Sequence, residues 1–402
     1  MEIKYKDIEN KIFVIPDLSI PITYVSIIFL IGNYLENPNN LGINNLCFKT
    51  LIRSTKTMDY ESLQYYLEKN SVSISSSVGN FSSAISISFP YYNYKKAIEI
   101  LKEVLFNYSF RNEDISEVKR DFLNSIKLSR DDVWTYLYEN ADSAFYNSFL
   151  SWDTRGNKQT LKNIQRKNLI KWLENKIFDK KIKKIMVISG YTSPTFENQI
   201  YKTFSKFLNN ENLYSEKMNN FDVIKTKKIK KLGKKEVGIC LIYEAPNLSE
   251  NSIKFKVLNG ILSSMSGRLF INIREKKELA YAITSIYDPI PFGKGNIKIM
   301  MLTNKEKKQK ALHSLREEIN DILQKGFTQE ELDISKNYIT GLFSSAMQKR
   351  SFKNALLAKI KAYNLPDSYL FDHLKIIKET TLEEINSLSK IFQTKESTFI
   401  VV

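Results

Sequence analysis

The sequence predicts an α+β protein made of two homologous domains, residues 1–218 and 219–402. Two observations support this: the order of strand-like and helical runs in the first half returns in the second, and a short motif recurs with the same spacing. The motif reads Phe110-x-x-Glu113-Asp114-Ile115 and then Phe327-x-x-Glu330-Glu331-Leu332. Because a fixed internal spacing in two copies is typical of a duplicated unit, we place the boundary near Asn219.

The first half begins with strands and continues mainly with helices. Strand-like runs cover residues 11–15 and 23–31, a hairpin pattern around Gly79-Asn80 covers 71–89, and a buried apolar strand covers 184–190. Helices are expected at 41–53, 59–69, 94–106 and 113–128, and further helical sequence extends to about residue 177. In the helix at 41–53, apolar residues recur at i, i+3, i+4, i+7 and i+8, which predicts an amphipathic helix.

Length and composition bound the class of protein. The chain has 402 residues, enough for two or three domains with buried cores. The first thirty residues lack the pattern of a secretion signal, and the apolar run at 22–31 is too short to span a bilayer, so we expect a cytoplasmic protein without a membrane segment. Cys47 and Cys240 lie in apolar surroundings and are expected to be core residues.

The formal net charge of +16 invites a nucleic-acid interpretation, but the distribution of the charge argues against it. Lysines far outnumber arginines and are spread along the chain, and aromatic and basic residues do not interleave in a recognisable module. The densest basic run, residues 225–235, is interpreted as a solvated connection, with a patch for an acidic partner as the alternative. We therefore expect no nucleic-acid partner.

The sequence lacks the motifs that would let this chain catalyse a reaction alone. The chain contains only two histidines, His313 and His373, and neither falls in a catalytic motif. His313 and Glu317 are four residues apart on an expected helix, but no third metal ligand is suggested, so a solvated helix face is the simpler explanation. The sequence also lacks a Gly-rich phosphate loop and a nucleophile elbow.

Residues 266–281 form a helix-to-strand junction that carries Arg274 and Tyr281. A planar cationic fork and a phenol donor can together hold a peptide carbonyl and stabilise a developing oxyanion. Taken alone, the pair favours a structural role, because an arginine and a tyrosine seven residues apart often occur by chance.

Together, the order of the two halves and their local patterns resemble the insulinase and pitrilysin-like zinc metallopeptidases, the inverzincins. In that family a helix of the first half carries Gly-x-x-His-x-x-Glu-His, with a further glutamate ligand on a later helix. Here the helix reads Leu41-Gly42-Ile43-Asn44-Asn45-Leu46-Cys47-Phe48-Lys49. The resemblance places Asn45 and Lys49 at the histidine positions, Phe48 at the general base and Ser125 at the distal ligand. It therefore implies a degenerate zinc motif and no metal in this chain.

The second half keeps the family's other motif, Ser-x-Arg-Leu-Phe-x-x-Ile-Arg-Glu-x-x-Gly-Leu-Ala-Tyr. The matching residues are Ser266, Arg268, Leu269, Phe270, Ile273, Arg274, Glu275, Leu279, Ala280 and Tyr281. Glu278 replaces the usual glycine. The resemblance implies that Arg274 and Tyr281 hold the substrate backbone and support the tetrahedral intermediate.

In function, the resemblance implies a catalytically incomplete subunit of a heterodimeric zinc peptidase, similar in role to the alpha subunit of mitochondrial processing peptidase. Each domain would be an α/β sandwich with an antiparallel-rich sheet and helices on one face, and the chain would be half of a clamshell. A homologous partner subunit of similar length would bring the zinc, and a peptide or unfolded polypeptide would be the substrate. The alternative is a non-enzymatic structural or scaffold protein on the same fold.

Overall fold

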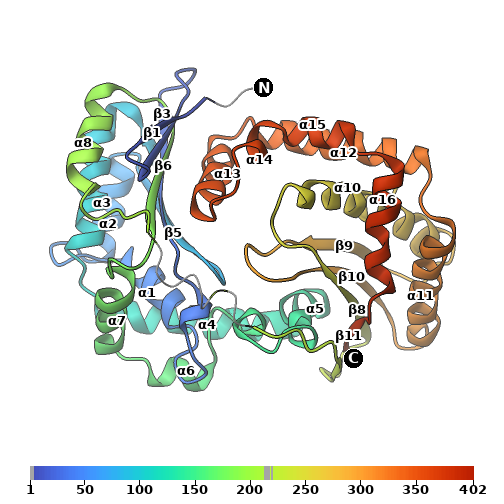
Figure 1. The fold of residues 1–402 in the computed structure, drawn as a ribbon. Coiled ribbons are helices and arrows are strands. Elements are labelled where there is room, and N and C mark those ends of the chain that lie inside the picture. Colours follow the sequence, from blue (N-terminus) through green and yellow to red (C-terminus); the bar gives the residue numbers. More distant parts are fainter. Residues whose placement is uncertain (1–3, 212–217, 219–220) are drawn as a thin grey trace. The chain divides into compact units, whose positions relative to one another are not determined.

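The computed structural model describes residues 4–211, 218 and 221–402, which form two compact units (Figure 1). The first unit comprises residues 1–126, 152–220 and 347–370, and the second comprises 127–151, 221–346 and 371–402. Each unit therefore contains a segment from the other half of the sequence. The predicted boundary near Asn219 lies outside the described residues.

A six-stranded sheet forms the centre of the first unit. Its strands are β1 (Lys6–Ile8), β2 (Ile12–Pro16), β3 (Ile22–Phe29), β4 (Ser73–Val78), β5 (Ser83–Pro90) and β6 (Lys184–Gly190). They lie in the order β1-β2-β6-β3-β5-β4, with β2 and β6 parallel and the other neighbours antiparallel. Every residue of β6 is buried, as expected for an apolar run in the middle of a covered sheet. Strand β4 lies at one edge.

Helices cover both faces of this sheet: α13 (Arg350–Ala362) lies on one face, and helices from the first half of the chain lie on the other. The helices of this part of the chain are η1 (Asn33–Leu35), α1 (Ile43–Leu51), α2 (Tyr60–Lys69), η2 (Tyr91–Asn93), α3 (Tyr94–Phe106), α4 (Asn112–Asp131), α6 (Lys158–Asn163), α7 (Arg166–Trp172), η5 (Leu173–Ile177) and α8 (Pro194–Phe204). Their apolar faces form one core with the sheet, including Leu46, Cys47 and Phe48 of α1. The predicted helices at 41–53, 59–69, 94–106 and 113–128 are confirmed to within a few residues at their ends.

The second unit contains a five-stranded sheet with the same topology. Its strands are β7 (Lys227–Lys230), β8 (Glu236–Ala245), β9 (Ala282–Asp288), β10 (Gly295–Asn304) and β11 (Ser397–Val401). The order β7-β11-β8-β10-β9 matches β2-β6-β3-β5-β4 strand for strand, including the single parallel pair. The predicted duplication is therefore visible in the strand order, and the α+β class with two mixed sheets is confirmed.

The second half of the chain contributes its own set of helices. They are α10 (Asn251–Ser263), η6 (Phe270–Glu275), α11 (Lys308–Lys325), α12 (Gln329–Ala346), α13 (Arg350–Ala362), α14 (Ser368–Phe371), α15 (His373–Glu379), α16 (Leu382–Leu388) and η7 (Ser389–Gln393).

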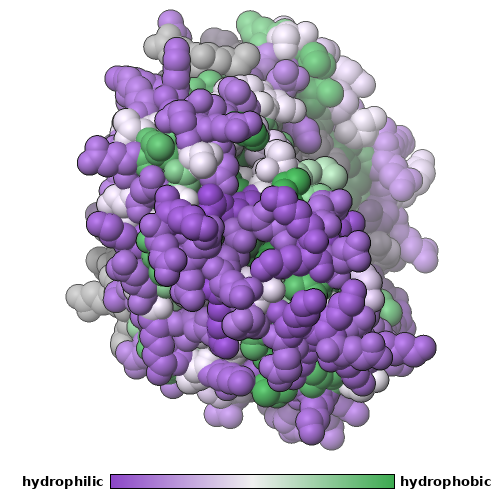
Figure 2. Space-filling model, turned by 90° about the vertical axis from the view of Figure 1, so that its right-hand side faces the viewer, coloured by the Kyte–Doolittle hydropathy of each residue, from purple (hydrophilic) through white to green (hydrophobic). Residues whose placement is uncertain are grey.

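The face over α11 and α16 is mostly hydrophilic, with separate hydrophobic spots (Figure 2). Basic and acidic side chains are paired there, for example Lys325 with Asp321 and Lys277 with Glu317, so this face is not a uniform basic patch.

One helix from each half of the chain packs on the sheet of the other half. Helix α5 (Val133–Asn140), which is followed by η3 (Ala141–Ala144) and η4 (Phe149–Ser151), contacts strands β8, β10 and β11. Gly238 of β8 makes room for it, since a Cβ there would lie 3.1 Å from a methyl group of Val133. In the first unit, α13 contacts β3 and β6, and Asn354 donates to the carbonyl oxygen of Val187 at 2.8 Å.

Two smaller expectations have clear outcomes. Cys47 and Cys240 are free and buried, as predicted. The basic run at 225–235 is not only a connection: residues 227–230 form the edge strand β7, whose backbone pairs with β11 while its side chains remain exposed. Periodicity missed this strand because lysines dominate it. Across the described ranges, we find no helix long and apolar enough to cross a membrane.

Candidate functional site

The junction at 266–281 begins where helix α10 ends. The amide of Gly267 donates to the carbonyl oxygen of Ser264 at 2.8 Å. A Cβ at Gly267 would lie 2.7 and 2.8 Å from two backbone carbonyl oxygens, so only glycine fits this turn. The chain then forms the π-helical segment η6, in which Ile273 is buried, and reaches β9 directly after Tyr281. The buried Ile273 anchors the segment and leaves its neighbour Arg274 at the surface.

Within the described ranges, the side chain of Arg274 is held by weak contacts. Its guanidinium carbon lies 4.7 Å from the centre of the Phe270 ring, and its Nε atom lies 4.0 Å from Oε1 of Glu275. The side chain is 42% exposed. A weakly paired, half-exposed guanidinium keeps donors available for a carbonyl or carboxylate ligand.

Tyr281 is held in place through its backbone. Its amide donates to the carbonyl oxygen of Leu302 on β10 at 2.8 Å, which positions the residue at the start of β9. The residue is 58% exposed, and its hydroxyl has no hydrogen-bond partner within the described part of the chain. The phenol is therefore available as a donor.

Arg274 and Tyr281 line the same pocket, which has a volume of about 280 Å³. The lining residues are Arg274, Glu275, Glu278, Leu279, Ala280, Tyr281, Thr303 and Lys307. The structure thus brings the two predicted residues to one cavity of the second unit. Acidic and basic groups both line this cavity, so a polar ligand such as a peptide backbone suits it.

Glu278 adopts the backbone conformation that glycine favours. Its φ angle is 51°, in the left-handed region. The carbonyl oxygen of Glu278 accepts a hydrogen bond from Nζ of Lys307 at 2.9 Å, which helps to hold the turn. The turn is therefore formed with a side chain in place of the usual glycine, at a conformational cost of about 1 kcal/mol.

Arg268, the other arginine of the junction, has a structural role. Its side chain is only 10% exposed, and it donates to the carboxylate of Glu331 from Nε at 2.7 Å and from Nη2 at 2.9 Å. Nη2 also donates to the carbonyl oxygen of Gly326 at 3.2 Å. Burial and the hydrogen bonds to Glu331 and Gly326 separate this arginine from Arg274.

In the first unit, a buried carboxylate that sequence reasoning missed binds the backbone at the start of α1. Both carboxylate oxygens of Glu36 accept backbone hydrogen bonds, from Gly42 at 2.9 Å and from Asn44 at 2.8 Å. Burial raises the pKa of Glu36 to about 7, against the opposing effect of these two donors. The only signal in the sequence was an acidic residue shortly before a helix, which is too common to be diagnostic.

The positions that correspond to a zinc motif are engaged in packing and hydrogen bonds. Phe48 is fully buried, with its ring centre 5.3 Å from that of Phe29. Nζ of Lys49 donates to the carbonyl oxygen of Ser76 on β4 at 2.9 Å, and burial lowers the pKa of Lys49. Asn45 is buried, and its Oδ1 atom has no partner among the described residues.

Ser125, at the distal ligand position, accepts a hydrogen bond from Nη1 of Arg155 at 3.0 Å. The four positions thus offer an amide, a phenyl ring, an ammonium group and a hydroxyl group. None of these suits a zinc ion, which prefers imidazole, thiolate and carboxylate. No cluster of three or more His, Cys, Asp or Glu side chains suited to a metal occurs in the part of the chain that the structure describes. His313 is exposed and pairs with Glu317, and His373 is buried and stacks on Phe343.

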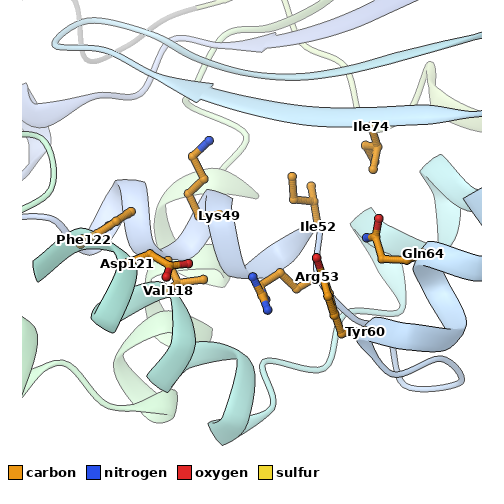
Figure 3. A pocket seen from close by; sticks show the side chains of 9 residues that line it. All are labelled: Lys49, Ile52, Arg53, Tyr60, Gln64, Ile74, Val118, Asp121 and Phe122. Atoms are coloured by element: carbon orange, nitrogen blue, oxygen red, sulfur yellow. The ribbon is translucent and has the colours of Figure 1, made fainter. Parts of the chain in front are cut away.

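A second pocket, of about 360 Å³, lies beside Lys49 (Figure 3). The residues that line it come from α1, α2, β4 and α4 and from the loops that flank them: Lys49, Ile52, Arg53, Tyr60, Gln64, Ile74, Val118, Asp121 and Phe122. The first unit thus has a cavity where its helices meet the edge strand.

Comparison with known protein families assigns the chain to a class. The model of the insulinase family, peptidase family M16, matches residues 13–152, and the model described as the peptidase M16 inactive domain matches residues 164–339. Together the two models span most of the chain in the order of the two halves. The chain belongs to the M16 (insulinase) peptidase family.

Individual relatives are distant but cover most of the chain. A Helicobacter pylori protein described as "Non-peptidase homolog YmxG" is 24% identical over 399 residues, which is 95% of this chain and 89% of the relative. A Bacillus subtilis protein described as "Uncharacterized zinc protease YmxG" is 21% identical over 75% of this chain and 73% of the relative.

Solved structures share the fold. The crystal structure of a peptidase M16 inactive domain from Pseudomonas fluorescens has a TM-score of 0.88 at 17% identity, covering 100% of this chain and 98% of that one. A chain of complex III from Candida albicans has a TM-score of 0.79 at 12% identity, covering 100% of this chain and 96% of that one. At these identities the likeness concerns the fold.

Proposed function

We propose that this chain is the zinc-free subunit of a two-chain M16 peptidase. It would be inactive alone and would contribute Arg274 and Tyr281 to a site whose zinc and general base come from a homologous partner subunit of similar length. The observation that supports the proposal most directly is that Arg274 and Tyr281, both exposed, line one pocket. The residues at the zinc-motif positions offer no ligand set in the same chain.

The two side chains suit two tasks in peptide hydrolysis. The hydroxyl of Tyr281 can donate to the scissile carbonyl oxygen as negative charge develops on it. The planar fork of Arg274 can donate to a neighbouring backbone carbonyl and fix the register of the peptide. Both act on backbone atoms, so the expected substrate is a peptide or an unfolded segment of no particular sequence.

Mixing experiments test the proposal. The partner is sought as a homologous chain with an intact His-x-x-Glu-His motif, encoded beside this one. We expect peptide cleavage from the mixed chains, none from this chain alone, and zinc only in the partner by elemental analysis. Stoichiometric zinc in this chain, or equal cleavage by the partner alone, would contradict the proposal.

A structural subunit is the second candidate function. The description of the Helicobacter pylori relative as a non-peptidase homologue favours it, and so does the fold shared with a chain of complex III. In that case the two chains would form a stable complex in which substitutions at Arg274 and Tyr281 leave every measured activity unchanged.

A further inference from the structure

Lys49 is a half-buried cation that has no carboxylate partner among the residues that the structure describes. Its single hydrogen bond in the described structure goes to the carbonyl oxygen of Ser76 at 2.9 Å, and it forms no ion pair with any described residue. An ammonium group has three donors, so two remain for a ligand. In Figure 3 the Lys49 side chain extends from α1 toward the strand that carries Ile74.

The walls around Lys49 are largely apolar. Ile52, Ile74, Val118 and Phe122 line the pocket of about 360 Å³, and they come from the residue after α1, from β4 and from α4. An unpaired charge beside aliphatic and aromatic walls suits a ligand that combines a charged group with an apolar side chain.

The second cation of the pocket is already neutralised. Nε of Arg53 lies 3.4 Å from Oδ1 of Asp114, and its Nη2 pairs with Glu117. The guanidinium also stacks on Tyr60, 4.1 Å from the ring centre. Arg53 therefore forms part of the wall, and among the described lining residues Lys49 is left as a cation without an ion pair.

Asp121 adds a carboxylate to the lining of the pocket. The side chain is exposed at the pocket and forms no ion pair within the described ranges, including with Lys49. One positive and one negative group that do not pair with each other favour a ligand whose own charges are separated by a spacer. Asp121 would repel a simple anion such as phosphate.

We propose that this pocket binds a short zwitterionic peptide with apolar side chains. Its terminal carboxylate accepts from Lys49, its side chains contact Ile74 and Phe122, and its terminal ammonium group points toward Asp121. This site is in the first unit and does not depend on Arg274, Tyr281 or a partner subunit.

Calorimetric titration of the full chain alone tests the proposal. The probes are the dipeptide Leu-Leu, its C-terminal amide, its N-acetyl form and the amide of Leu-Glu, which offers a side-chain carboxylate only. We expect Leu-Leu to bind and both amides to bind at least about tenfold more weakly, since a partly buried charged hydrogen bond is lost. Acetylation should weaken binding by about threefold, because Asp121 is exposed.

Protein variants complete the design. Lys49→Met should weaken Leu-Leu binding by at least about tenfold, Lys49→Arg should retain most of it, and Asp121→Asn should match the effect of acetylation. Lys102→Met, which removes an exposed lysine of α3 outside the pocket, is the matched control and should change nothing. The modified peptides test the wild-type protein directly, so a variant that fails to fold does not end the experiment.

Four results would overturn the proposal: no binding of Leu-Leu, equal binding of Leu-Leu and its amide, equal binding of Leu-Leu and its N-acetyl form, or the same loss from Lys102→Met as from Lys49→Met. Because the partner subunit is absent from these titrations, none of these results bears on the proposed peptidase function.

Discussion

Arg268 and Glu331 form a two-pronged ion pair, with Nε and Nη2 of the arginine 2.7 and 2.9 Å from the two carboxylate oxygens. The first half contains the equivalent pair, Arg53 with Asp114. Asp114 and Glu331 occupy the same position in the repeated Phe-x-x-Glu-Asp/Glu motif. The motif therefore supplies, in each half, the carboxylate that ties the start of a long helix to an arginine.

Arg268 is buried in an ion pair and Arg274 is half-exposed, so substitutions at these two arginines should affect stability differently. Arg268→Lys should lower the free energy of unfolding by about 2 kcal/mol, because lysine cannot form the two parallel hydrogen bonds to Glu331. Arg274→Lys should change it by less than about 0.5 kcal/mol, because Arg274 is half-exposed. Urea unfolding of the free chain measures both values. Equal losses would mean that Arg274 is also structural.

Tyr281→Phe tests the proposed catalytic contribution. In the mixed pair of chains, this variant should lower kcat by about a hundredfold, or about 3 kcal/mol, because the donor to the developing oxyanion is lost. Tyr338→Phe, at another exposed tyrosine of the second unit, is the control and should leave turnover unchanged. Assembly and the zinc content of the partner are measured in parallel. Unchanged turnover for Tyr281→Phe would favour the structural-subunit alternative.

The sequence predicted the duplicated order of elements because the signals behind it are local. Apolar periodicity defined α1, and the hairpin pattern around Gly79-Asn80 defined β4 and β5. The exchange of α5 and α13 between the units could not be predicted in this way. It depends on complementary surfaces, such as the space above Gly238, that no local pattern records.

The candidate site was only partly accessible from sequence. The motif identified Arg274 and Tyr281, but the distinction between Arg274 and Arg268 needed burial and partners. The Lys49 pocket was invisible, because its walls come from segments that are distant in sequence. The sequence showed that the zinc ligands are replaced. Only the structure showed that the ammonium group of Lys49, at one of these positions, lines a pocket.

Glu278→Gly should stabilise the chain by about 1 kcal/mol, because a side chain in the left-handed region is strained and glycine is not. The carbonyl that accepts from Lys307 is retained, so the turn itself should persist. Glu278→Ala is the matched control: it removes the carboxylate, keeps the strain and should show no gain. Thermal unfolding distinguishes the two. A gain from alanine equal to that from glycine would point to the charge of Glu278 and not to its backbone.

Glu36 predicts a pH dependence of stability. Its pKa is raised to about 7 in the folded chain, from about 4.5 when unfolded, so the folded state binds a proton more tightly than the unfolded state. Its contribution is fully present below pH 4.5 and is lost as the pH rises to about 7, with a span of about 3 kcal/mol. Glu36→Gln does not titrate, so the free energy of unfolding of the wild type, measured against this variant, should fall between pH 4.5 and 7. A difference that is constant over this range, or that rises with pH, would show that the two backbone donors at the start of α1 outweigh burial and keep the carboxylate ionised.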